Sequence, residues 1–301
     1  WHIRQAEKLA PKEPTEPPIK YTIGHMALSL NRPQVTVDTY AKKDFQVWLS
    51  LWTGRAAGSW VFEHLTCAHH MLGNYKQELK EARRGLKYYP NMLSLRRHEV
   101  RALAALGRVD EVNKIIDDSL TITSQAGTSG DVMLEAAQEL RAQRHLEAYK
   151  EVSARAVDWY RAKLSTKEAT ENKRYDLARA LYVAEQWEES QALIEELAGE
   201  KPENIDYRGY LGTLAARRGD REEAYRISTE LESIDRPYMF GNHTYWRALV
   251  ASQLGDLEQA VELLREAFAQ GRGYGVYLHR DMDLEPLREY PPFQELLRPK
   301  G

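Results

Sequence analysis

Apolar residues recur every three or four positions along most of this chain, which is the spacing of one face of an α-helix. In the stretch 244–269 apolar residues recur in steps of three, four and five, with the step of five beside the turn: Tyr245, Leu249, Leu254, Leu257, Val261, Leu264 and Phe268. The stretch 174–197 repeats the pattern. The alternation of apolar and polar residues that is typical of β-strands is nearly absent. The pattern therefore predicts an all-α protein.

A turn motif recurs at nearly regular intervals. Gly73 and Gly107 are 34 residues apart, Glu185 precedes Gly219 by 34 residues, and Gly255 follows Gly219 by 36 residues. Glycine at such a position ends a helix, because it adopts the left-handed conformation without steric cost. A proline follows two of these turns by 17 residues, where a second helix has to end. Each period therefore predicts two amphipathic helices joined by a tight turn.

We expect about seven such helix pairs, near 17–43, 55–90, 93–120, 131–164, 171–200, 205–232 and 242–270. The first pair has Asn31 at its turn, and the fourth has no glycine there. Two connectors between pairs differ in composition. Residues 121–131 are small and polar, so we expect an exposed and mobile loop. Residues 233–244 include Tyr238 and Phe240, so we expect a packed loop.

The repeats resemble the tetratricopeptide repeat, whose signature is W-x₂-L-G-x₂-Y, then A-x₃-F, then P. The stretch 207–231 carries the Leu-Gly step of this signature at Leu211-Gly212. The stretch 62–90 also follows the signature, but it has Glu78 where the second helix usually has alanine. The match is loose in each repeat and extends along most of the chain.

This resemblance implies a right-handed α-solenoid over residues 17–270, in which each helix pair stacks on the next. The last repeat of a solenoid has no neighbour to cover it. The tail 271–301 breaks the period, so we expect it to be a C-terminal cap. We interpret residues 1–11 as the end of an unfinished upstream repeat. The tail and the Gly-Asp turns also resemble the carboxyl-terminal end of bacterial multidomain regulators, in which such an array follows a kinase, cyclase or winged-helix domain.

Composition and charge narrow the range of partners. The 301 residues are 43% hydrophobic and 29% charged, and the net charge is −3. This balance fits a folded protein and gives no basic surface for nucleic acid or anionic lipid. No apolar run approaches the ~18 residues of a membrane helix. Cys67 is the only cysteine and leaves the compartment open; we favour the cytoplasm, or an extracytoplasmic location if a transmembrane segment precedes this chain.

Three stretches contain residue types found in catalytic or metal sites. The stretch 64–70 (HLTCAHH) holds three histidines and a cysteine, but their spacing suits a tetrahedral zinc site poorly. We interpret residues 279–283 as a loop in which an aspartate caps a short helix. The glycines of 271–275 lack the Lys-Ser/Thr step of a phosphate loop. The sequence therefore predicts no catalytic, cofactor-binding or metal-binding residue.

The better candidates for a site lie on the first helix of each pair, which lines the concave face in tetratricopeptide arrays. The candidate partner-binding residues, which we expect to point outward there, are Arg97, Arg101, Arg141, Tyr175, Arg179, Tyr182 and Arg217. Forked guanidinium groups pair well with carboxylates, and Tyr and Arg dominate binding energy at interfaces. A solvated helix face is the alternative interpretation.

These features predict a non-enzymatic helical-repeat scaffold. We expect it to bind a protein or peptide, either acidic or through a terminal carboxylate, or another domain of a longer chain. Two alternatives stay open: a small-molecule sensor or enzyme with a pocket inside the curved array, and a structural oligomerisation module. We expect neither a nucleic-acid partner nor membrane insertion of this segment.

Overall fold

The computed structural model describes residues 19–52, 56–124, 126–165 and 170–300. Within these ranges every regular element is a helix and no strand is present, which confirms the all-α prediction. The predicted end of an upstream repeat, residues 1–11, lies outside the described residues.

Contacts divide the chain into two compact units. Unit 1 comprises residues 1–145, 273–279 and 299–301, and unit 2 comprises residues 146–272 and 280–298. The tail, which the sequence predicts to be one cap, contributes segments to both units. The short helix α17 (Tyr277–Arg280) lies where the tail passes from unit 1 to unit 2.

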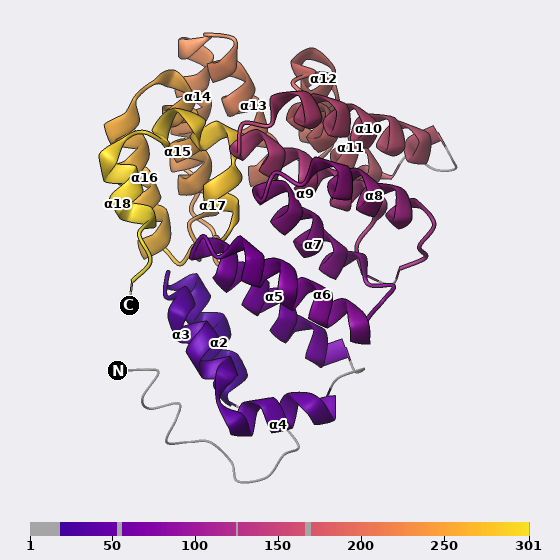
Figure 1. Cartoon of the computed structure of the whole chain (residues 1–301). Coiled ribbons are helices and arrows are strands. Elements are labelled where there is room, and N and C mark those ends of the chain that lie inside the picture. Colours follow the sequence, from indigo (N-terminus) through magenta and orange to yellow (C-terminus); the bar gives the residue numbers. More distant parts are fainter. Residues whose placement is uncertain (1–18, 53–55, 125, 166–169, 301) are drawn as a thin grey trace. The chain divides into compact units, whose positions relative to one another are not determined.

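Helices that are adjacent along unit 1 pack against each other, and α5, α7 and α9 also contact one another in that order (Figure 1). This packing of alternate helices is what repeated helix pairs produce. The helices of unit 1 are α2 (Ile19–Ser29), α3 (Pro33–Ala41), α4 (Lys43–Trp52), α5 (Ala56–Met71), α6 (Tyr75–Tyr88), α7 (Leu93–Ala105), α8 (Val109–Leu120) and α9 (Ser129–Ala142).

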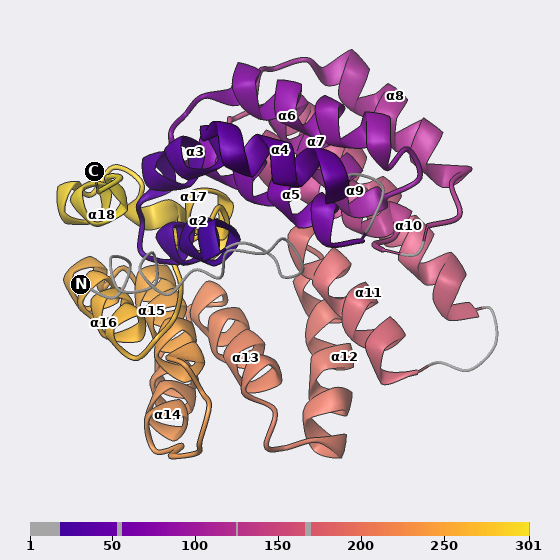
Figure 2. The ribbon, with the colours of Figure 1, turned by 90° about the horizontal axis from the view of Figure 1, so that it is seen from below.

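Unit 2 follows the same rule, since neighbouring helices pack in order and α13 also contacts α15 (Figure 2). Its longer helices are α10 (Leu146–Ser165), α11 (Glu171–Val183), α12 (Trp187–Glu200), α13 (Ile205–Arg217), α14 (Arg221–Glu232), α15 (Asn242–Leu254) and α16 (Leu257–Ala269). The 3₁₀-helix η1 (Met282–Leu287) and the short helix α18 (Pro291–Leu297) follow.

One turn recurs between successive helices. Its left-handed residue, with positive φ, is Asn31, Gly73, Gly107, Arg144, Glu185, Gly219 or Gly255. At Gly73, the amide donates to the His70 carbonyl (2.9 Å), and the Asn74 amide donates to the His69 carbonyl (2.8 Å). These bonds satisfy carbonyls that the end of a helix leaves unpaired. Gly219 and the residue after it make the same two bonds, so the turns at Gly73 and Gly219 are equivalent, as predicted.

Small residues determine how closely the helices of unit 2 approach. Ala224, five residues after Gly219, is fully buried. Gly209 in α13 lies against the indole of Trp246 from α15, and a β-carbon at position 209 would overlap that ring. Glycine is therefore required in the middle of this helix by packing, although it weakens an isolated helix.

Segments of the tail pack into each unit separately. In unit 2, η1 packs on α15 and α18 packs on α16. In unit 1, the Tyr274 amide donates to the Ser29 carbonyl (3.0 Å), and Val276 is buried against Leu28 and Met71. Figure 2 shows this yellow segment beside α2. A part of the tail far from α2 in sequence therefore completes the core of the first helix pair.

The described residues of 121–128 are exposed or partly exposed, as expected, and hydrogen bonds anchor them to unit 1. The Ser124 hydroxyl accepts the Leu93 amide (3.2 Å) and the Ala126 carbonyl accepts the Ser94 amide (3.1 Å), so the 121–131 connector is tied to the N-terminus of α7. In the 233–244 connector, by contrast, the rings of Tyr238 and Phe240, which were expected to be packed, lie in solvent.

Candidate functional site

The seven candidate residues fall into two groups that belong to different units. Arg97 and Arg101 lie on α7 and Arg141 lies on α9, all in unit 1. The other candidates, in unit 2, are Tyr175, Arg179 and Tyr182 on α11 and Arg217 on α13. We describe each group within its own unit.

Arg101 is the centre of a buried ionic cluster in unit 1, which we call the Arg101 cluster: Cys67, His70, Glu78, Arg101, Glu135 and Glu139. The Arg101 guanidinium donates through Nε to Glu78 Oε1 (2.6 Å) and through Nη1 to Glu135 Oε1 (3.2 Å). Arg101 is only 2% exposed. The prediction that Arg101 points outward is therefore wrong, because two carboxylates from neighbouring helices hold it inside.

His70 extends the Arg101 cluster toward α9. Its Nδ1 lies 2.8 Å from Glu78 Oε2 and its Nε2 lies 3.6 Å from Glu139 Oε2. Gln143 donates to the other oxygen of Glu139 (2.9 Å), whereas Oε2 makes no hydrogen bond among the described residues. The cluster thus places three buried carboxylates around one arginine and one histidine.

The Cys67 thiol lies 4.0 Å from Arg101 Nη2. Burial raises the pKa of this thiol, and the effect exceeds the lowering by Arg101. For Arg101 itself, burial lowers the pKa, but Glu78, Cys67 and Glu135 raise it further, so the net shift is upward. A protonated thiol beside a fixed guanidinium is the opposite of an activated cysteine nucleophile. We therefore assign the Arg101 cluster a structural role.

Arg97 and Arg141 are more accessible. The Arg97 side chain is 40% exposed and its Nη2 lies 3.0 Å from Glu135 Oε2. Glu135 raises the pKa of Arg97, so this guanidinium stays charged. Arg141 is partly exposed on α9. Because Arg97 is already paired with Glu135, its guanidinium is less available to a partner's carboxylate than the sequence suggests.

In unit 2, Tyr182 and Arg217 both bind Asp283, and we call Tyr182, Arg217, Tyr245, Asp281 and Asp283 the Asp283 cluster. The Tyr182 hydroxyl lies 2.7 and 2.8 Å from the two carboxylate oxygens, and Arg217 Nε donates to Oδ1 (3.0 Å). Tyr182 is buried, and burial followed by Asp283 raises the pKa of its hydroxyl. The prediction that Tyr182 points outward is therefore also wrong, and Arg217 is mostly buried.

Asp281 performs the capping role that the sequence predicts for residues 279–283. Its Oδ1 accepts the Asp283 amide (2.9 Å) at the start of η1, and its Oδ2 accepts the Tyr245 hydroxyl (2.7 Å). Burial and the nearby Asp283 charge raise the pKa of Asp281 to about 6. Its ionisation therefore falls near neutral pH.

Tyr175 and Arg179 differ from the other candidates in unit 2. The Arg179 side chain is 38% exposed, and its nearest carboxylate oxygen, on Asp176, is 3.6 Å away. Its guanidinium lies 5.9 Å from the centre of the Tyr175 ring, and that ring lies 6.1 Å from the ring of Tyr210 on α13. We call Tyr175, Arg179 and Tyr210 the Arg179 surface. Among the candidates in unit 2, Arg179 is the one whose charge is accessible.

The histidines of the 64–70 stretch have separate partners. His64 Nδ1 lies 2.9 Å from the Tyr40 hydroxyl, and its Nε2 lies 3.2 Å from His25. Burial and His25 lower the pKa of His64 to about 4. His70 instead contacts Glu78, as described above. No group of three or more metal-ligating side chains with suitable geometry occurs in the part of the chain that the structure describes.

Sequence reasoning missed the acidic partners of the arginines. Glu78, Glu135 and Glu139 come from helices other than α7, and spacing along one helix says nothing about its neighbours. One signal was present: Glu78 occupies the small-residue position of the tetratricopeptide signature. A charge at a position that packing reserves for alanine requires a buried partner.

No protein-family model matches this chain, and no curated protein sequence matches it either. Among the described residues, no helix is both long and apolar enough to span a bilayer.

Proposed function

We propose that this chain is a non-enzymatic helical-repeat module, similar to a tetratricopeptide array, that binds an acidic peptide on the Arg179 surface of unit 2. The observation that carries the proposal is the state of Arg179, which is accessible and whose nearest carboxylate oxygen among the described residues is 3.6 Å away. Repeated helix pairs present extended surfaces that suit peptides.

Three other arginines of the predicted site make shorter contacts with carboxylates. Arg101 and Arg217 each bind carboxylates inside the fold, and Arg97 binds Glu135. Burial lowers the pKa of Arg179, but its neighbours Tyr210, Tyr175, Tyr160 and Asp176 raise it further, so the net shift is upward. It therefore keeps its charge and offers a fork of donors to a carboxylate.

Two tyrosine rings make the Arg179 surface suited to a peptide. Tyr175 and Tyr210 are partly exposed and meet nearly edge to face at 76°. Aromatic rings give contact area at low entropic cost, because few of their torsions have to be fixed on binding. A carboxylate of the peptide would pair with Arg179 while an adjacent side chain packs on the rings. The partner can be another protein or another domain of a longer chain.

Calorimetric titration with synthetic peptides tests the proposal. The probes are a peptide of about ten residues rich in Asp and Glu, and a peptide of equal length with Asn and Gln in their place. The acidic peptide should bind, and Arg179→Ala should weaken its binding at least about tenfold, since a charged hydrogen bond is lost. Arg161→Ala, which removes an exposed arginine elsewhere in unit 2, should leave the affinity unchanged. Equal affinity for both peptides, or an unchanged Arg179→Ala variant, would overturn the proposal.

A further inference from the structure

The connector between α14 and α15 carries the two most exposed large apolar side chains of the described residues. Tyr238 is 86% exposed and Phe240 is 62% exposed, whereas the other exposed large apolar residues lie at about half or below. Their rings are 6.1 Å apart. We call residues 235–240 the aromatic tip. Exposed apolar groups of this size usually mark an interaction surface.

The backbone of the aromatic tip is strained and held in place. Tyr238 has φ 63° and Phe240 has φ 47°, in a region that bulky residues rarely adopt. The base of the tip is fixed, because Arg236 Nη2 donates to the Glu203 carbonyl (2.7 Å). The Asn242 amide also donates to the Met239 carbonyl (2.9 Å). Strain that surrounding contacts maintain is characteristic of functional segments.

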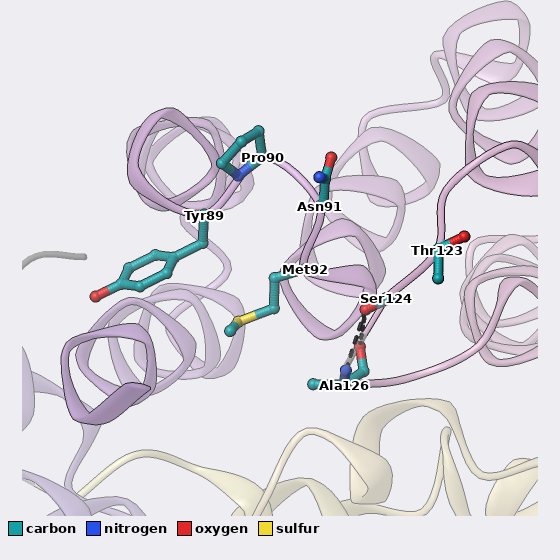
Figure 3. A pocket seen from close by; sticks show the side chains of 7 residues that line it. All are labelled: Tyr89, Pro90, Asn91, Met92, Thr123, Ser124 and Ala126. Atoms are coloured by element: carbon teal, nitrogen blue, oxygen red, sulfur yellow. Dashed lines mark hydrogen bonds between the residues drawn. The ribbon is translucent and has the colours of Figure 1, made fainter. Parts of the chain in front are cut away.

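Unit 1 has a surface hollow, lined by uncharged described residues, that could receive an aromatic ring. It has a volume of about 270 Å³ and is lined by Tyr89, Pro90, Asn91, Met92, Thr123, Ser124 and Ala126. Figure 3 shows one wall formed by the connector between α6 and α7 and the other by the connector between α8 and α9. Ser124 fixes the second wall, since it accepts the Leu93 amide and donates to the Ala126 carbonyl (2.8 Å). The hollow, which we call the Met92 hollow, is thus formed before any partner arrives.

We propose that the aromatic tip of one copy of this chain inserts into the Met92 hollow of a second copy. This inference goes beyond the proposed peptide binding and does not depend on it. None of the described residues that line the hollow is charged, which suits Tyr238 or Phe240. Next to the rings, Asp235 is exposed, and Lys87 is exposed two residues before the hollow begins. Opposite charges thus flank the two apolar surfaces.

The charges around the tip favour a protein occupant. Asp235 is exposed beside the rings, whereas the Arg236 guanidinium is bound at the base of the tip by the Glu203 carbonyl. An exposed acidic group opposes docking onto anionic lipid or nucleic acid. The contact joins two different surfaces, so it is heterologous and lets copies add head to tail. One or two rings in a hollow bury less area than a stable dimer requires, so the association should be weak and depend on concentration.

Sedimentation velocity over a protein range of roughly 10 to 500 μM, which covers weak interfaces of this kind, tests the proposal. The tip variant is Tyr238→Ser with Phe240→Ser. The hollow variant is Thr123→Trp, which fills the hollow from an exposed position of its wall. The wild-type chain should form dimers and larger species as concentration rises, and each variant alone should stay monomeric. The control Thr121→Trp, exposed on the same connector, should associate like the wild type.

A mixture of the two variants distinguishes this contact from any other. The hollow variant keeps a working tip and the tip variant keeps a working hollow, so the mixture should form one-to-one complexes and nothing larger. A wild-type chain that remains monomeric throughout would overturn the proposal and assign the tip to a different partner. Association that neither variant reduces would also overturn it. Circular dichroism of both variants checks that the helices are intact.

Discussion

The Arg101 guanidinium donates to Glu78 at 2.6 Å from inside unit 1, where both side chains are almost completely buried. Two helices, α6 and α7, are joined by this pair. Since Arg101 also reaches Glu135 on α9, one side chain links three helices. Removing a buried charge leaves its partners unpaired, which costs far more than the pair contributes in net terms.

Arg101→Met should therefore lower the free energy of unfolding by about 3–5 kcal/mol, because Glu78 and Glu135 lose their common cation in a buried site. Urea unfolding followed by circular dichroism measures this change. Arg108→Met, which removes an exposed arginine paired with Glu111, should leave the midpoint nearly unchanged. A loss below about 1 kcal/mol for Arg101→Met would show that water reaches the Arg101 cluster.

Adding Glu78→Leu to Arg101→Met should recover part of the loss, since it removes one of the two stranded carboxylates. Such a recovery would show that the unpaired carboxylate, and not only lost packing, destabilises the Arg101→Met variant. If the double variant is less stable than the sum of the two single effects, the pairing account of the Arg101 cluster is wrong.

Tyr182→Phe should destabilise the chain by about 1–2 kcal/mol, because it removes the buried hydroxyl that binds Asp283 and leaves that carboxylate with one donor fewer. Tyr225→Phe is the matched control, since the Tyr225 hydroxyl also binds an aspartate, Asp256 (2.6 Å), but at an exposed position. Thermal unfolding of both variants compares the two bonds. Equal shifts in Tm would indicate that burial adds nothing to the Tyr182 bond.

The turns could be predicted from the sequence because their signal is local. A left-handed residue at the end of a helix favours glycine whatever surrounds it, and Gly73, Gly107 and Gly219 all have positive φ. Arg144 and Glu185 adopt the same conformation without glycine. The fourth pair therefore has a turn of the same kind at Arg144, although the sequence has no glycine there to mark it.

Which arginine side chains are exposed and which are buried could not be predicted in this way. Arg97 and Arg101 lie four residues apart on one helix face, yet one is 40% exposed and the other is buried. Glu135 pairs with both arginines, but Arg101 also pairs with the buried Glu78, which lies 23 residues away in the sequence. Spacing along a helix identifies residues that share a face, but it does not identify the side chains that the adjacent helices bring to that face.

The raised pKa of Asp281 predicts a distinct pH dependence. The folded state holds the proton of this carboxyl more tightly than the unfolded chain does, because its pKa is about 6 rather than 3.8. The stability it provides is complete below the unfolded pKa and is lost as pH rises through about 6. Asp281→Asn keeps a capping oxygen and has no charge to bury. The free energy of unfolding of the Asp281→Asn variant, relative to that of wild type, should therefore increase by about 1–3 kcal/mol from pH ~4 to pH ~7.

Urea unfolding of wild type and Asp281→Asn across this pH range measures the difference. Asp235→Asn, at an exposed aspartate in the same unit, should give a profile parallel to wild type. Parallel profiles for Asp281→Asn would mean that the folded and unfolded pKa values of Asp281 are the same.

Two glycines inside the helices of unit 2 should respond in opposite directions to the same substitution. Gly209 in α13 lies under the Trp246 ring, so the β-carbon of alanine would overlap the indole. Gly209→Ala should therefore cost about 1–3 kcal/mol as the ring is displaced from its place between the helices. At Gly199 in α12, a β-carbon would meet no neighbouring atom within 4 Å, so Gly199→Ala should gain about 0.5–1 kcal/mol from helix propensity alone.

Chemical denaturation of both variants measures these changes, and tryptophan fluorescence should shift only for Gly209→Ala. If both variants are stabilised to the same extent, Trp246 does not pack on α13 as described, and the close approach of α13 and α15 in unit 2 loses its explanation.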